Sequence, residues 1–141
     1  MERTFAGRCL CGDVTFQANG KPVVVAQCHC EECRRLSGTG HASGAMFSWA
    51  DVQIEGELGR YDYTSANGST VTKTFCRTCG SSIYGTNSHS PGHVTLSLGA
   101  FDPAPELDIE VVIFDRDKPR WDTAGPDVMR FDTQPRWSPD D

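Results

Sequence analysis

The chain has 141 residues, 38% of them hydrophobic and 23% charged, which is typical of one globular domain with a modest core. Its net charge is −6, with 13 Lys and Arg against 19 Asp and Glu, so it lacks the basic excess of nucleic-acid-binding proteins. No apolar run reaches the length of a signal peptide or membrane helix, so we expect no membrane association and a cytoplasmic location.

Short β segments separated by Gly, Pro, Asn and Ser dominate the chain, without sustained helical periodicity. This pattern predicts a mainly β fold, with strands at 13–18, 23–27, 44–47, 52–57, 60–63, 71–75, 94–98 and 109–114. One short helix is predicted around 31–36, ended by Gly38 in a left-handed cap. Asn67-Gly68 predicts a tight turn within 65–69. Prolines after residue 115 predict an irregular tail that packs over the sheet.

The seven cysteines fall into three clusters, which are Cys9 with Cys11, then Cys28, Cys30 and Cys33, then Cys76 with Cys79. In a reducing compartment, clustered thiols are more often metal ligands or catalytic groups than disulfides. Zinc prefers four soft ligands in a tetrahedron, commonly supplied as close pairs from distant parts of a chain. Seven thiols then divide as four plus three, which predicts two zinc sites.

The first and third clusters resemble each other, because both end in Cys-Gly and continue into a β-type segment. A glycine after the second ligand lets the backbone turn and direct N–H groups at the sulfurs. We therefore predict one structural zinc site made of Cys9, Cys11, Cys76 and Cys79. Such a site contributes roughly 10–16 kcal/mol of apparent binding energy to folding. The alternative is two pairs of buried or redox-active thiols.

The middle cluster has three thiols within six residues and is followed by Arg34 and Arg35. Three protein ligands leave a fourth position open, as in catalytic zinc sites. The two arginines are candidates for holding a substrate carboxylate or stabilising the thiolates. Two alternatives stay open: the arginines form a solvated face, or His29, His41 or Glu31 closes the site.

His29, His89 and His93 are more readily placed away from the metal. In an extended segment the side chain of His29 points to the opposite side from its neighbouring cysteines. This predicts that His29 either faces solvent or contacts the metal ligands without binding the metal itself. His89 and His93 belong to a segment rich in Ser, Pro and Gly and are expected at the surface.

Three motifs together resemble the glutathione-dependent formaldehyde-activating enzyme and centromere protein V family. They are Gly7-x-Cys9-x-Cys11-Gly12-x-Val14, Cys28-His29-Cys30-x-x-Cys33-Arg34-Arg35-x-Ser37-Gly38, and Phe75-Cys76-x-x-Cys79-Gly80-Ser81. The likeness extends to Leu98-Gly99-Ala100-Phe101-Asp102 and Lys118-Pro119-x-Trp121. It covers roughly residues 5–122, which defines the expected domain, with 123–141 as an extension packing on it.

The resemblance implies a β-tent fold, with one zinc on the outer cysteine pairs and a second zinc on the middle three cysteines. It also implies condensation of glutathione with formaldehyde to S-(hydroxymethyl)glutathione, which in reverse is a carbon–sulfur lyase reaction. We therefore expect a zinc-dependent lyase acting on a small thiol adduct, with no general acid or base assigned. The alternatives are a non-enzymatic zinc-stabilised binding module and a thiol redox sensor.

Overall fold

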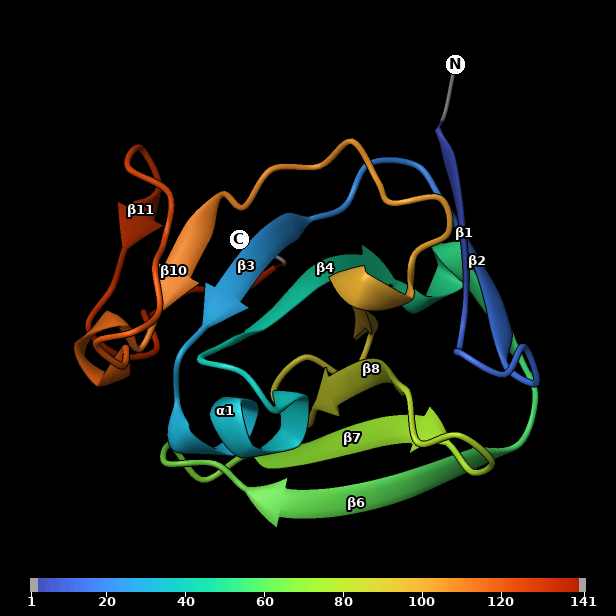
Figure 1. The fold of residues 1–141 in the computed structure, drawn as a ribbon. Helices are drawn as coiled ribbons and strands as arrows, with labels where there is room; N and C mark the ends of the chain where they lie inside the picture. Colours follow the sequence, from blue (N-terminus) through green and yellow to red (C-terminus); the bar gives the residue numbers. More distant parts are fainter. Residues whose placement is uncertain (1–2, 140–141) are drawn as a thin grey trace.

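The computed structural model describes residues 3–139, which form two β-sheets, one α-helix and three short 3-10 helices (Figure 1). The three-stranded antiparallel sheet contains β1 (Thr4–Arg8), β2 (Thr15–Asn19) and β5 (Val52–Glu55). The other sheet has eight strands in the order β11-β10-β3-β4-β9-β8-β7-β6. Their bounds are β3 Val24–Cys28, β4 Ala42–Ser48, β6 Leu58–Thr64, β7 Thr70–Cys76, β8 Ser82–Asn87, β9 His93–Ser97, β10 Val111–Ile113 and β11 Met129–Arg130.

The helix α1 (Glu31–Ser37) lies where the sequence predicts it and follows β3 directly. Its first turn is capped by the Cys30 side chain, and Gly38 ends it in the left-handed conformation with φ 78°. The 3-10 helices are η1 (Trp49–Asp51), η2 (Leu98–Ala100) and η3 (Asp115–Asp117). The predicted turn at 65–69 joins β6 to β7, and its backbone hydrogen bonds run from Ser65 N to Ser69 O and from Gly68 N to Ser65 O.

The mainly β prediction is confirmed, and each of the eight predicted strands overlaps an observed one. Three strands were not predicted, namely β1, β8 and β11. In β1 and β8 a central glycine, Gly7 or Gly85, removes one β-forming residue from a short segment, so the alternation is too brief to recognise. In β1 the glycine is required by packing, because a Cβ at Gly7 would overlap the ring of Phe16.

The two faces of the large sheet differ sharply in burial. Residues paired directly across antiparallel strands share a face, so the strand register defines two neighbouring rows. The buried row is Val25, Ala45, Leu96, Tyr84 and Thr74, each at most 7% exposed. The adjacent row on the opposite face is Val24, Met46, Thr95, Gly85 and Lys73, all half-buried. We call this second side the open face.

The core lies between the buried face of the large sheet and the three-stranded sheet. Four phenylalanines form its centre, with ring centroids of Phe5 and Phe47 at 5.9 Å, Phe5 and Phe101 at 5.7 Å, and Phe16 and Phe101 at 5.2 Å. All three pairs have edge-to-face geometry, which is favourable for aromatic rings. This packing fixes β1, and with it the cysteines that follow β1, against the large sheet.

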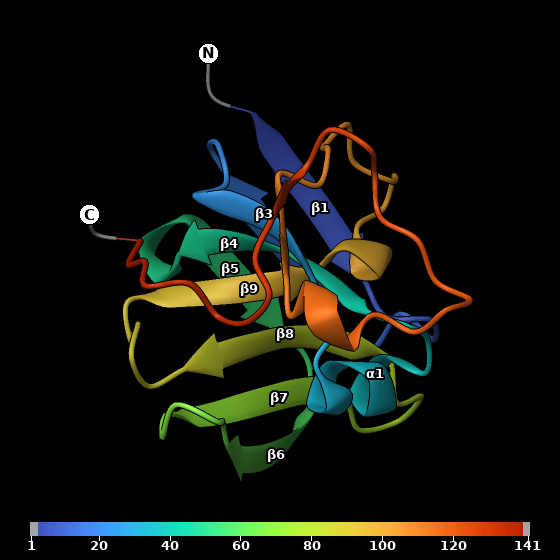
Figure 2. The same ribbon diagram turned by 90° about the vertical axis from the view of Figure 1, so that its left-hand side faces the viewer.

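The far edge of the large sheet is parallel rather than antiparallel. β10 pairs in parallel with β3 on one side and with β11 on the other. The chain after residue 122 is otherwise irregular and passes over the molecule on the side where α1 lies (Figure 2). Across the described chain, no helix is both long and apolar enough to span a bilayer.

Candidate metal centres and cleft

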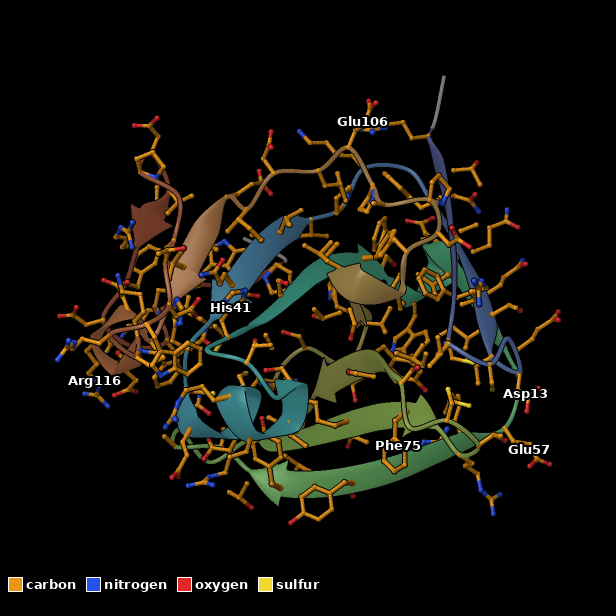
Figure 3. The ribbon with its side chains drawn as sticks, in the orientation of Figure 1. Asp13, His41, Glu57, Phe75, Glu106 and Arg116 are labelled. Atoms are coloured by element: carbon orange, nitrogen blue, oxygen red, sulfur yellow. The ribbon has the colours of Figure 1, made fainter. Side chains whose placement is uncertain are left out.

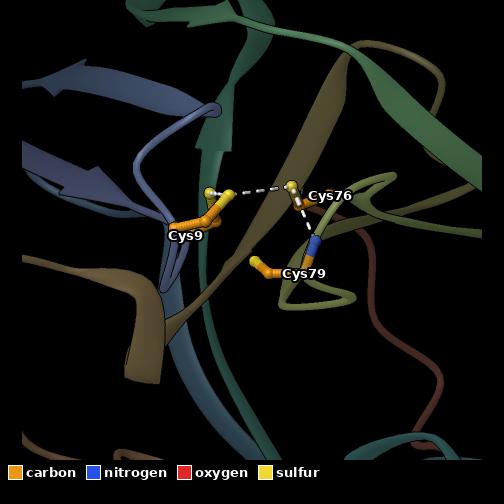
Figure 4. Close-up of side chains that lie close together, drawn as sticks. Cys9, Cys76 and Cys79 are labelled. Atoms are coloured by element: carbon orange, nitrogen blue, oxygen red, sulfur yellow. Dashed lines mark hydrogen bonds between the residues drawn. The ribbon is translucent and has the colours of Figure 1, made fainter.

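Four cysteine side chains meet where the two sheets approach each other (Figure 4). The sulfurs of Cys9, Cys11, Cys76 and Cys79 all lie within 4.8 Å of one another, and every cysteine in the chain is a free thiol. The Sγ–Sγ distances are 3.6 Å from Cys9 to Cys11 and 3.8 Å from Cys11 to Cys76. A tetrahedron with Zn–S bonds of about 2.3 Å has edges of about 3.8 Å. The spacing of these sulfurs therefore fits a zinc ion.

The backbone around this four-thiol cluster is arranged to receive negative charge. The Val14 N–H donates to Cys9 Sγ at 3.2 Å, and the N–H of Cys79 donates to Cys76 Sγ at 3.5 Å. Both turns are closed by a glycine with positive φ, 87° at Gly12 and 80° at Gly80. A hydrogen bond from Ser81 is the main cause that lowers the pKa of Cys79 to about 5.

The other three cysteines form a second group, the three-thiol cluster, at the junction of β3 and α1. Cys28 ends β3, Cys30 caps the helix, and Cys33 is buried in its first turn, with all three sulfurs within 4.8 Å of one another. The Cys33 N–H donates to Cys30 Sγ at 3.4 Å. Hydrogen bonds from Cys28 and then Cys30 lower the pKa of Cys33 to about 3, while the pKa of Cys28 is raised. Three soft donors gathered this closely suit a thiophilic dication.

Within residues 3–139, no histidine or carboxylate joins the three-thiol cluster. Glu31 instead pairs with Arg35 at 3.1 Å on the surface of α1. His29 and His41 belong to a separate group with Asp122. Two positions were expected for His29, and the solvent-facing one is wrong, because the side chain is fully buried and lies in a different group from its cysteine neighbours. The segment around Asp122 covers it.

His29 is held by hydrogen bonds on both ring nitrogens. Gln27 Nε2 donates to the Thr123 carbonyl at 3.1 Å and also lies 3.0 Å from His29 Nε2. The amide nitrogen of Gln27 can only donate hydrogen bonds. His29 Nε2 is therefore the acceptor, and His29 Nδ1 carries the ring proton. That proton is donated to the Gly40 carbonyl at 2.8 Å. Both ring nitrogens of His29 are therefore engaged in hydrogen bonds, which favours a positioning role over metal binding.

Asp122 connects both histidines. Its Oδ2 lies 2.7 Å from His41 Nδ1 and 3.3 Å from His29 Nδ1. Burial opposes ionisation of this carboxyl group, but hydrogen bonds from His41 and from the Thr123 N–H outweigh it, so the pKa of Asp122 is lowered. His41 precedes β4 and lies close to the end of β3 (Figure 3). Sequence reasoning missed Asp122, which is 81 positions from His41.

A wide cleft borders the large sheet, and its lining includes residues of the open face as well as Thr74 and Tyr84 of the buried row and Cys9 of the four-thiol cluster. All three sulfur-bearing residues of the three-thiol cluster line it, together with Tyr63, Lys73, Gly85 and Thr95. The helix α1 lies beside β7 and β8 in two perpendicular views (Figures 1 and 2), which places the cluster at the same cleft. Arg34 and Arg35 are not among the lining residues. Arg35 is an exposed helix residue whose side chain is 73% accessible.

Tyr63 and Lys73 are cleft residues that sequence reasoning did not single out. Burial, followed by the charge of Cys33 and Cys30, raises the pKa of Tyr63, so its hydroxyl stays protonated. The Lys73 ammonium contributes to lowering the pKa of Cys33. One signal was present in the sequence. Lys73 and Val71 are two positions apart in β7 and therefore share a face, so a cation lies beside an apolar residue on that face of the strand.

Residues 4–117 match the glutathione-dependent formaldehyde-activating enzyme family. The chain belongs to this family. The fold is similar to that in a crystal structure of a Rhodobacter sphaeroides protein, with a TM-score of 0.58 and 19% identity over 89% of this chain and 98% of that chain. No curated protein sequence matches the chain.

Family membership associates the chain broadly with glutathione-dependent formaldehyde activation, and the clustered thiols suit a metal such as zinc. All seven cysteines lie inside the region that matches the family. Asp122 lies beyond it, so the carboxylate that supports His29 comes from the chain that follows the matched region.

The contact between Gly40 and Asp122 allows a direct test of this packing. A Cβ at Gly40 would lie 2.6 Å from Asp122 Cβ, which is closer than real Cβ contacts occur. Gly40→Ala should therefore destabilise the protein by about 1–3 kcal/mol, because overpacking forces the two segments apart. Chemical denaturation measures this difference. Gly92→Ala is the matched control, since nothing lies within 4 Å of its Cβ position. Equal stability of the two variants would contradict the close packing of Asp122 on Gly40.

Proposed function

We propose that this protein is a zinc-dependent enzyme of the carbon–sulfur lyase type that makes or breaks the adduct of a small thiol with formaldehyde. Glutathione is the proposed thiol, and a reducing cytoplasm is the proposed setting. The observation that carries the proposal is the three-thiol cluster. Its three sulfurs meet at a cleft, and no further His, Cys, Asp or Glu among the described residues joins them as a fourth ligand. Membership of the glutathione-dependent formaldehyde-activating enzyme family supports the choice of substrates.

The two thiol clusters are proposed to have different tasks. Cys9, Cys11, Cys76 and Cys79 would hold a structural zinc, since four ligands close the tetrahedron. Cys28, Cys30 and Cys33 would hold a second zinc. When bound by three thiolates, zinc supplies a free coordination position and lowers the pKa of a thiol that enters it.

The reaction forms one C–S bond, opens the C=O π bond and moves one proton. The thiol sulfur forms a bond to the formaldehyde carbon, the C=O π pair moves onto oxygen, and the S–H proton is released while the new alkoxide oxygen gains one. The cleft brings sulfur and carbon together, and positioning of this kind supplies several kcal/mol. Tyr63 lines the same cleft, its hydroxyl is protonated because its pKa is raised, and we propose it as a hydrogen-bond donor to that oxygen. No side chain has to act as the nucleophile.

Cys28→Ala separates the two clusters experimentally. We expect purified wild-type protein to contain close to two zinc ions, and the variant to contain one while keeping its fold, because Cys28 belongs only to the three-thiol cluster. Metal content is measured by elemental analysis, and the fold by near-ultraviolet circular dichroism. Wild-type protein should also accelerate the exchange between formaldehyde and its glutathione adduct, which NMR measures. The exchange rate with the variant should be at least about 100-fold lower, which corresponds to an activation free energy higher by about 2.7 kcal/mol.

Two results would contradict the proposal. Loss of both zinc ions from Cys28→Ala would show that the clusters do not act separately. Wild-type protein that does not accelerate exchange over buffer would favour a zinc-stabilised binding module instead. A redox sensor would be recognised by formation of a disulfide within the three-thiol cluster under mild oxidation, with release of one zinc ion.

A further inference from the structure

Lys73 occupies an unusual position on the open face. It lies in the middle of β7, directly opposite Tyr61 of β6 and Gly85 of β8. A Cβ added to Gly85 would lie 3.2 Å from Lys73 Nζ and 3.4 Å from Lys73 Cδ, so the side chain runs across the glycine. The ammonium group is therefore held against the floor of the cleft, and the absence of a side chain at residue 85 makes room for it.

No carboxylate among the described residues pairs with Lys73. The ion pairs of residues 3–139 use other cations, with Arg8, Arg35, Arg116 and Arg130 each paired to a carboxylate. Lys73 forms none, although it is half-buried and the whole chain carries a net charge of −6. A partly desolvated ammonium without a carboxylate partner favours the binding of an anionic group.

The position of this charge relative to the three-thiol cluster indicates which anion it would meet. Lys73 and all three cysteines of the cluster line the same cleft. Thr95, two strands away in the same row, and Asn87 add neutral polar groups to the cleft lining. A substrate with its sulfur at the cluster could therefore extend across the open face toward the Lys73 ammonium and these hydrogen-bonding groups.

The other cations near the cluster are less suitable. Arg35 is turned to solvent and paired with Glu31, and neither Arg34 nor Arg35 lines the cleft. His41 is bound to Asp122 at 2.7 Å. Arg116 lines the cleft but is paired with Asp117 at 3.6 Å.

We propose that Lys73 binds a carboxylate of the thiol substrate, so that the protein prefers carboxylate-bearing thiols over neutral or cationic ones. This rests on the proposed function and deepens it by naming a specificity-determining residue. It replaces Arg34 and Arg35 in the role that sequence analysis gave them. A charge-assisted contact of this kind is worth about tenfold or more in affinity.

Three thiols of equal length test the proposal: 3-mercaptopropionate, 3-mercapto-1-propanol and 3-amino-1-propanethiol. Binding to the zinc-loaded protein is measured by isothermal titration calorimetry, and exchange with formaldehyde by NMR. Wild-type protein should bind the carboxylate about tenfold more tightly than the alcohol. Lys73→Met should remove this preference without weakening the alcohol, and Lys73→Glu should shift it toward the amine. Lys21→Met, a change at an exposed lysine outside this cleft, is the control and should keep the wild-type order.

The outcomes separate this inference from the proposed function. A preference for the carboxylate that survives both Lys73 substitutions, or that depends on Arg35→Gln instead, overturns the role of Lys73. If selective binding depends on Lys73 but no thiol undergoes faster exchange, the binding role stands and the proposed catalysis fails. If exchange is accelerated equally for all three thiols in every variant, the catalysis stands and the role of Lys73 is wrong.

Discussion

Replacing Cys76 with alanine should unfold the domain. Cys76 is only 1% exposed and its sulfur lies in the four-thiol cluster, where it accepts hydrogen bonds from two backbone N–H groups. A structural zinc contributes roughly 10–16 kcal/mol of apparent binding energy, which equals or exceeds the ~5–15 kcal/mol by which domains are normally stable. Loss of one of four ligands therefore removes most or all of the stability. Circular dichroism and the dispersion of amide NMR signals measure the result.

Cys28→Ala is the matched control, because it removes a thiol from the other cluster. A Cys76→Ala protein that stays folded and soluble and still holds two zinc ions would rule out the structural role of the four-thiol cluster. Addition of a zinc chelator to the wild-type protein should reproduce the unfolding without any substitution. The pattern across the two variants then distinguishes loss of metal from loss of packing around Cys76.

Asp122→Ala should have the second largest effect. The substitution leaves the Nδ1–H of His41 without its acceptor and removes the carboxylate that lies against the buried His29. Removal of a partly buried charged partner from such a network costs about 3 kcal/mol, or a fall in Tm of about 10 °C for a domain of this size. Because His29 stands between Cys28 and Cys30, we also expect weaker zinc binding at the three-thiol cluster.

Thermal denaturation of Asp122→Ala and of Asp127→Ala gives the comparison, since Asp127 is an exposed carboxylate in the same segment. The pH dependence has a defined sign. The pKa of Asp122 is lowered from 3.8, so its carboxylate stabilises the folded state above that pH, and this contribution is lost as the pH falls through the folded-state pKa. The stability difference between wild type and Asp122→Ala should therefore shrink below about pH 4. A difference that is constant with pH would contradict an ionised Asp122.

The strands could largely be predicted because most of them alternate clearly between buried and half-buried residues. In β3, Val25 and Gln27 are buried while Val24 and Ala26 are not, which is the period-2 pattern of a sheet with one covered face. The sequence could not indicate that β10 pairs in parallel with β3, because the partner strands are separated by most of the chain. Nor could it reveal a two-residue strand such as β11, which is too short to show any period.

The two thiol clusters could be predicted from the spacing of the cysteines, because each consists of pairs or triplets that are close in sequence. The structure brings the same cysteines together. That they hold zinc, and that one set is open, stay predictions. Asp122 and Lys73 could not be found in this way, since each acts through residues that only the fold brings near. Half-burial of His93 also differs from the expected surface loop, because β9 begins at that residue.

The two thiol clusters also differ in when they become available as a chain is synthesised. Cys28, Cys30 and Cys33 lie within one short segment, whereas Cys11 and Cys76 are 65 positions apart. A growing chain therefore exposes the three-thiol cluster to zinc long before the four-thiol cluster can close, and closing the longer loop costs more entropy. The local cluster would capture the first ion from the cell's supply. If both clusters hold zinc as proposed, completion of the fold would wait for a second ion, and zinc availability during translation would set the yield of native protein.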